Sequence, residues 1–191
     1  MKDRIVETIH TGADALLQMS DSLADQLQCA SDLLVERLLQ GARIFTWGGG
    51  LNASLAQVCS HLLHTGHLRA RPPFPALCLN TDTSLLSGAG SSTAVESQLT
   101  ALAQPGDVLI TFCSGDNPEG LAAAIAFAHQ GGLTVIAFCC PTDDHILNAL
   151  NANDCAITPF THSPVAVIHT LMLAAVTLCD TVEQHLFGAD P

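Results

Sequence analysis

Two short loops contain the residue types that bind phosphate groups in proteins. Glycines let backbone amides approach an anion closely, and a helix that begins just after such a loop favours negative charge at its N-terminus. Two such loops side by side predict a phosphate cradle, although a tight strand-to-helix turn is the structural alternative for the glycines. The candidate ligands are Gly48, Gly49, Gly50 and Asn52 in the first loop, and Ser114 and Asn117 in the second.

The first loop does not have the pattern of a nucleotide-binding loop. No lysine follows its glycines, as the G-x-x-x-x-G-K-[ST] motif requires, and Ala53 interrupts a G-x-G-x-x-G motif. The loop therefore predicts anion binding without indicating a nucleotide.

Three histidines, His61, His64 and His67, follow the first loop at three-residue spacing. Two of them can share one helix face, and His169 is a candidate third ligand for zinc. Histidines at a surface or an interface are the alternative that we favour, so we predict no metal ion and no cofactor. Cys113 has no histidine placed beside it by any motif, and we expect it to pack as a small residue rather than act as a nucleophile.

The elements that must position these residues are strands alternating with helices. Apolar runs bounded by turns fit a sheet covered on both faces. The alternation predicts an α/β fold, a doubly wound five-stranded parallel sheet, with ligands bound beyond the carboxyl ends of the strands. The expected strands are residues 43–47, 74–79, 107–112, 133–138 and 154–158, and the expected helices between them are 52–65, 92–103, 118–130 and 145–150.

Both ends of the chain are predicted to be helical. Apolar residues at three- or four-residue steps indicate two helices in residues 1–40, a helical oligomerisation segment that ends at Gly41. A long closing helix should begin after Ser163 and run to about Phe187. Its apolar stretch is shorter than the ~20 residues of a membrane span and contains His169, so we expect a buried core helix and no membrane segment.

Composition and charge limit the partners. Charged residues are only 13% of the chain against a typical ~25%, so part of the surface is expected to be buried in an oligomer. The formal net charge of −12 repels phosphate backbones, which argues against direct nucleic-acid binding and favours a basic protein partner. None of the eight cysteines forms a C-x-x-C pair, and the first residues do not form a signal peptide. We therefore expect a cytoplasmic protein with buried, reduced thiols.

Four segments resemble the sugar isomerase (SIS) domain proteins. They are "WGGGLNASLAQ", "RARPPFPALCLNTD", "PGDVLITFCSGDN" and the long closing helix. The most similar branch contains the phosphoheptose isomerases and the DnaA initiator-associating proteins. The resemblance covers nearly the whole chain and implies a single SIS domain, residues 1–191, that assembles as a homotetramer.

The two loops depart from the pattern of that family. Gly49 and Asn52 replace an asparagine and a serine of the first loop. In the second loop two or three phosphate-binding hydroxyls are lost, and Asp116 adds a negative charge. Each lost charge-assisted hydrogen bond costs roughly 1.5–3 kcal/mol, so we expect weaker binding of a sugar phosphate than in the family.

The catalytic positions of the family depart further. The isomerases move a proton with a glutamate and a histidine, and these positions fall here on Leu62 and Val176. Neither side chain can transfer a proton, so the resemblance implies no catalytic residue in this chain. The zinc ligands that some members use fall on Val58, Leu62 and Ile168.

The function that we expect is a non-catalytic SIS-domain protein that binds DnaA and regulates initiation of chromosome replication. In the initiator-associating branch a Leu-Phe pair at the place of Leu186 and Phe187 is implicated in contact with DnaA, although core packing is the alternative. A second hypothesis is a phosphoheptose isomerase acting on sedoheptulose 7-phosphate, in which a one-turn shift of register gives His61 the acid–base role. A third is a sensor that binds a phosphosugar through the two loops.

Overall fold

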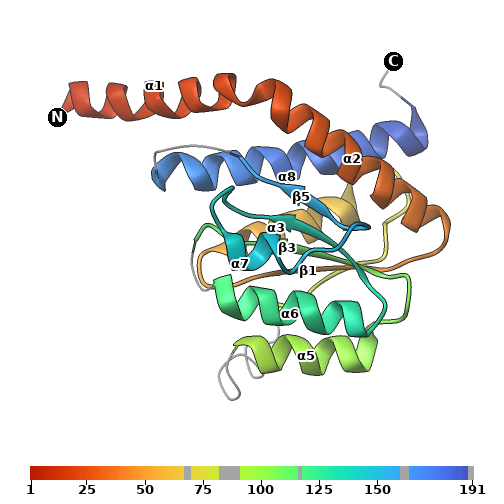
Figure 1. Cartoon of the computed structure of the whole chain (residues 1–191). Coiled ribbons are helices and arrows are strands. Elements are labelled where there is room, and N and C mark those ends of the chain that lie inside the picture. The colour runs from red at the N-terminus through yellow and green to blue at the C-terminus, as the bar shows by residue number, and fades with distance from the viewer. Residues whose placement is uncertain (67–69, 82–90, 116–117, 160–163, 189–191) are drawn as a thin grey trace.

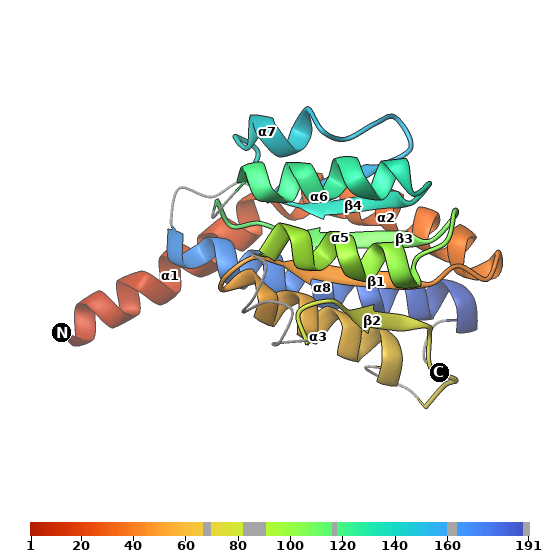
Figure 2. The same cartoon turned by 90° about the horizontal axis from the view of Figure 1, so that it is seen from below.

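Five parallel strands form the central sheet in the order β2-β1-β3-β4-β5 (Figure 1, Figure 2). The computed structural model describes residues 1–66, 70–81, 91–115, 118–159 and 164–188. The strand order reverses between β1 and β3, which confirms the predicted doubly wound sheet. The strands are β1 (Ile44–Gly48), β2 (Ala76–Cys78), β3 (Val108–Phe112), β4 (Thr134–Phe138) and β5 (Cys155–Ile157).

Helices cover both faces of this sheet (Figure 1). One face packs against α5 and α6, and the other packs against α2, α3 and α8. The helices are α1 (Lys2–Gln18), α2 (Ser20–Leu39), α3 (Asn52–Thr65), α5 (Ser91–Leu102), α6 (Pro118–Gln130), α7 (Asp144–Leu147) and α8 (Pro164–Phe187).

The three central strands are buried along their whole length, which explains their continuous apolar sequences. Successive side chains point to opposite faces of the sheet. Ile44 and Val108 therefore lie in the core formed with α3 and α8, whereas Phe45 and Leu109 lie in the core formed with α5 and α6.

Two elements are shorter than the sequence predicted. β2 begins only at Ala76, because the three prolines in residues 72–75 lack the N–H group that a strand donates. α7 ends at Leu147, because the chain turns there toward β5. The other boundaries agree within one or two residues, and the predicted cap Ser163 lies outside the described residues.

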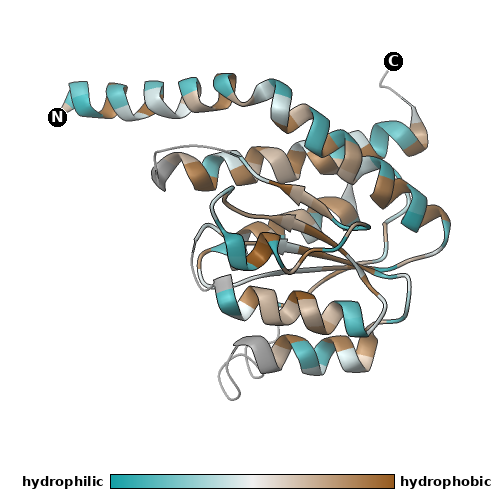
Figure 3. Cartoon of the chain, in the orientation of Figure 1, coloured by the Kyte–Doolittle hydropathy of each residue, from teal (hydrophilic) through white to brown (hydrophobic). Residues whose placement is uncertain are grey.

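The two predicted N-terminal helices are confirmed. α1 and α2 are separated at Met19, and α2 ends just before Gly41, whose φ of +83° suits the turn. α2 packs along α8 and β5, whereas α1 extends past the sheet and has no buried residue (Figure 1). The ribbon of α1 carries hydrophobic residues along its length (Figure 3), and Ile5, Ile9 and Leu17 among them are exposed in the single chain.

The closing helix α8 has the predicted bounds. Its segment Ala166–Phe187 is long and apolar enough to cross a membrane by length and composition, yet 56% of its most apolar stretch is buried inside the molecule. It packs against α2 and α3. The core therefore accounts for its apolar sequence, as we predicted.

Candidate functional site

Two of the three glycines at the end of β1 are required by the turn itself. A Cβ atom on Gly48 would lie 2.4 Å from the backbone oxygen of Asn52, so only glycine fits where β1 meets α3. Gly50 has a φ of +54°, a conformation that other residues rarely adopt. Gly49 has open space around its Cα atom and an ordinary φ. A tight strand-to-helix turn therefore explains the glycines at 48 and 50, but it does not explain Gly49.

Asn52, a predicted ligand, is fully buried at the start of α3. Its Nδ2 atom donates a hydrogen bond to the Gly49 carbonyl oxygen at 3.2 Å. Among the residues that the structure describes, its Oδ1 atom has no hydrogen-bond partner. A buried acceptor left unpaired costs about 1–3 kcal/mol, which favours a ligand that donates to it.

Asn80 fixes the end of β1, a role that sequence reasoning missed. Its Oδ1 atom accepts from the Gly48 N–H at 3.0 Å, and its Nδ2 atom donates to the Gly48 carbonyl oxygen at 2.8 Å. The side chain thus replaces the strand pairing that β2, ending at Cys78, no longer supplies. A polar residue directly after an apolar edge strand was the available signal.

The second loop leaves the sheet beside the first. Gly48 at the end of β1 is the register partner of Phe112 at the end of β3. Ser114 is half-buried, and Gly115 turns the chain with a φ of +96°. The structure therefore brings Ser114 to the same edge of the sheet as the first loop, whereas Asn117 and Asp116 lie outside the described residues.

Leu62 and Val176, the family's acid–base positions, pack into the hydrophobic core shared by α3 and α8. Leu62 is buried and Val176 is partly buried there. The structure thus has packed apolar side chains at the two positions where the family pattern has a proton-transfer pair. Cys113 is buried in the opposite core with α5 and α6, as predicted for a small packing residue.

The histidines on α3 line a separate hollow. His61 and His64, with Gln57 and Ser60, form one helix face beside the edge strand β2, bordering a cavity of about 400 Å³. His169 is exposed on α8, and His67 lies outside the described residues. Within the described part of the chain, no three His, Cys, Asp or Glu side chains lie close enough to hold a metal ion.

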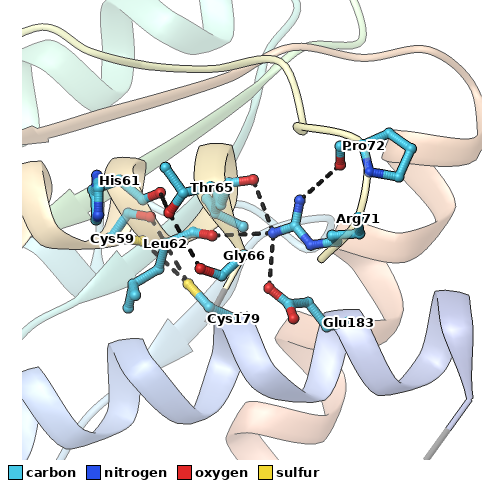
Figure 4. A network of polar contacts seen from close by, with 10 residues as sticks. Cys59, His61, Leu62, Thr65, Gly66, Arg71, Pro72, Cys179 and Glu183 are labelled. Carbon is cyan, nitrogen blue, oxygen red and sulfur yellow. Dashed lines mark hydrogen bonds and ion pairs between the residues drawn. The ribbon is translucent and has the colours of Figure 1, made fainter. Parts of the chain in front are cut away.

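A buried ion pair fixes the C-terminal end of α8 (Figure 4). Arg71 Nη2 lies 2.8 Å from Glu183 Oε1, and both side chains are only 1% exposed. The same nitrogen lies within 3.0 Å of the carbonyl oxygens of Leu62 and Leu63 at the end of α3. The guanidinium also lies over the Phe74 ring, 3.8 Å from its centroid. Arg71 therefore connects α3, the segment before β2 and α8.

Leu186 and Phe187, the predicted partner contact, pack against this end of the molecule. The Phe187 ring stacks on Phe74 with centroids 6.1 Å apart, and Leu186 packs against the core. Phe187 keeps 45% of its surface exposed. Both residues therefore have a packing role within the single chain.

Comparison with known proteins identifies the family. The SIS domain family matches residues 9–140. The chain belongs to the SIS domain family. Phosphoheptose isomerases from Chromohalobacter salexigens and Thiobacillus denitrificans are each 30% identical to this SIS-domain chain. The first alignment covers 98% of the chain and the second covers 100% of it, and each covers 98% of the relative. A phosphoheptose isomerase structure from Francisella tularensis matches 95% of the chain with a TM-score of 0.88 at 24% identity, and 97% of that structure is covered.

These relatives correct the function that we expected. The prediction of a DnaA-binding regulator of chromosome replication is wrong, because relatives that span the whole SIS-domain chain are phosphoheptose isomerases. A second phosphoheptose isomerase structure, from Neisseria gonorrhoeae, shares the fold with a TM-score of 0.85, at 21% identity over 96% of the chain and 98% of that structure. The Leu-Phe pair misled the prediction because its apolar side chains serve packing against Phe74 and the core.

Proposed function

We propose that this protein is a sugar-phosphate isomerase of the phosphoheptose type, which interconverts a ketose phosphate and an aldose phosphate. The observation that carries the proposal is the 30% identity to phosphoheptose isomerases over 98% of the chain. The paired loops at the ends of β1 and β3 support it, because they offer an anion the environment that a sugar phosphate needs. Sedoheptulose 7-phosphate is the substrate that we propose to test first.

The phosphate would be held by backbone amides rather than by basic side chains. The chain has only six lysines and arginines, and Arg43 and Arg71 already pair with Asp107 and Glu183. Amides of the glycine loop and the Ser114 hydroxyl can donate to phosphate oxygens. The unpaired Oδ1 atom of Asn52 can accept from a sugar hydroxyl.

His61 is the side chain that we propose for proton transfer. Isomerisation moves a proton between neighbouring carbons through an ene-diol, and an imidazole is suited to this near neutral pH. His61 lies one residue from Leu62 on α3 and borders the hollow beside β2, so this role requires the sugar chain to extend from the two loops along α3 into that hollow. No resident cofactor is part of this proposal.

A second candidate is binding of the same sugar phosphate without turnover. The core packing of Leu62 and Val176 favours it, because no acid or base stands at the family positions. The two candidates share the ligand and differ in whether it is converted.

Binding and conversion are measured on the same protein. With sedoheptulose 7-phosphate at about a hundredfold its Kd, we expect the melting temperature to rise by about 5–10 °C. Ser114→Ala should lose at least half of that rise, because a phosphate contact is removed. Thr100→Ala, which removes an exposed hydroxyl from α5, serves as the control and should keep all of it.

Conversion of the ketose to the aldose is then followed by chromatography. We expect turnover that His61→Ala abolishes while the thermal shift persists. A shift without any turnover would support the second candidate instead. Neither a shift nor turnover would contradict both candidates.

We propose that the apolar face of α1 is covered by another copy of the chain. Ile5 and Ile9 are 56% and 63% exposed at i, i+4 spacing, and α1 has no buried residue. A homotetramer is the assembly that we expect.

Light scattering should give a mass well above the 19.9 kDa monomer, and the double substitution Ile5→Asp with Ile9→Asp should lower that mass. Thr8→Asp with Thr11→Asp adds the same charge to α1 and should leave the mass unchanged, whereas a monomeric native chain would contradict the proposal.

A cytoplasmic location completes the proposal. Six of the eight cysteines are buried, and we propose that all eight are kept reduced. Cys29 is exposed and Cys140 is half-buried, so the expectation of buried thiols holds for the other six. The reducing cytoplasm keeps such thiols free.

A further inference from the structure

Two cysteines far apart in the sequence meet where α2 crosses β5. The Cys29 sulfur on α2 lies 3.2 Å from the Cys155 sulfur on β5. A disulfide has its sulfurs about 2.0 Å apart, so only a small approach separates this pair from a covalent bond.

The packing of α2 on β5 keeps the two sulfurs together. Gln26, one turn before Cys29, donates from Nε2 to the Thr158 hydroxyl at 3.1 Å and accepts from the Thr158 N–H at 2.8 Å. Thr158 follows directly after β5. Ala30, the next residue on α2, is fully buried. Residues before and after Cys29 on α2 therefore hold this helix in a fixed position against β5.

The two thiols differ in their access to solvent. Cys29 is exposed, whereas Cys155 is only 5% exposed. Burial raises the pKa of the Cys155 thiol, and the contact with Cys29 and the negative charge of Asp154 raise it further. An oxidant therefore meets Cys29 first, and Cys155 stands directly behind it.

A second close pair provides a comparison within the same molecule. The sulfurs of Cys59 and Cys179 lie 4.0 Å apart, and both residues are fully buried. These two sulfurs are farther apart than those of the first pair, and neither thiol is exposed to an oxidant in solvent. Proximity combined with exposure thus distinguishes the first pair from the second.

We propose that Cys29 and Cys155 form a reversible redox couple that responds to peroxides. Hydrogen peroxide oxidises the Cys29 thiol to a sulfenic acid and is itself reduced to water. The Cys155 sulfur then attacks the Cys29 sulfur, and the sulfenic oxygen leaves as a second water with the proton of the Cys155 thiol. Two thiols and one peroxide thus give one disulfide and two waters, and a thiol reductant restores both cysteines. The bond ties α2 to β5 independently of any sugar phosphate.

The full-length protein is treated with hydrogen peroxide, alkylated and mapped by mass spectrometry. We expect a linked peptide pair containing Cys29 and Cys155, which dithiothreitol converts back to two free thiols. Because the bond closes a loop of more than a hundred residues, the oxidised protein should melt about 5–10 °C higher. Cys59 and Cys179 should be recovered as free, alkylated thiols when the same sample is alkylated after unfolding.

Two variants separate the roles of the partners. Cys29→Ser should abolish linkage and leave Cys155 unoxidised, and its exposed position makes the change safe for folding. Cys155→Ser should leave Cys29 unprotected, so that it accumulates sulfinic acid instead of a disulfide. Sulfinic acid on Cys29 of the native chain without a linked peptide would overturn the proposal. So would an unreacted Cys29, or linkage of Cys59 to Cys179 in preference.

Discussion

Replacing Gly48 by alanine is expected to disrupt both the fold at the candidate site and ligand binding. The new Cβ atom would meet the backbone oxygen of Asn52 at 2.4 Å and its carbonyl carbon at 2.6 Å. These are backbone atoms of the first turn of α3, so they cannot move aside as a flexible side chain would. We expect the free energy of unfolding to fall by at least about 2 kcal/mol and the affinity for a sugar phosphate to fall by about tenfold or more.

The neighbouring glycine is a matched control for this substitution. Gly49→Ala adds the same methyl group one residue away, where φ is ordinary and no atom of the described chain, apart from the adjoining residues, lies within 4 Å of the new Cβ atom. Urea unfolding of this variant should agree with the native chain within about 0.5 kcal/mol. Equal losses of stability in the two variants would show that the approach of β1 to α3 is not what requires Gly48.

Removing the charge of Glu183 should destabilise the protein as strongly as any single change on α8. Glu183 and Arg71 are each 1% exposed and 2.8 Å apart, so Glu183→Gln leaves a buried guanidinium without its counter-charge. Breaking such a pair by changing one partner costs about 3–5 kcal/mol. The measurement is the free energy of unfolding in urea. Because Arg71 also contacts the end of α3, hydrogen exchange should increase in α3 as well as in α8.

A double-mutant cycle tests whether the cost comes from the unpaired charge. Arg71→Met combined with Glu183→Leu removes both charges and should recover part of the stability that either single change loses. Glu36→Gln, on an exposed glutamate of α2 that accepts from Gln40, controls for the loss of a carboxylate and should cost less than about 0.5 kcal/mol. Additive effects of the two single changes at 71 and 183 would contradict a coupled pair.

The architecture could be predicted from local patterns because those patterns are set by neighbouring residues. Apolar runs bounded by glycine and proline predicted all five strands, and helical spacing predicted α3, α6 and α8 with the bounds that the structure has. The prolines before Ala76 also explain why β2 is short. The position of both loops at one edge of the sheet followed from the parallel order of the strands.

The function was misjudged because departures at single positions were given more weight than likeness along the whole chain. Leu62 and Val176 are apolar as noted from the sequence, and they do pack together in one core. That observation limits the chemistry at two positions, but it does not identify a partner. The likeness to proteins named phosphoheptose isomerase extends over the whole chain, so it is stronger evidence for function than the residues at two positions.

Composition and periodicity thus specify which faces of each element are buried, because burial of apolar surface follows the repeat of a helix or a strand. They do not specify which distant side chains meet on those faces. Asn80 binds the backbone of Gly48 from 32 residues away, Arg71 pairs with Glu183 across 112 residues, and Cys29 meets Cys155 across 126. Such contacts depend on how the helices cross the sheet, and a crossing is set by the packing of the whole core rather than by any one segment.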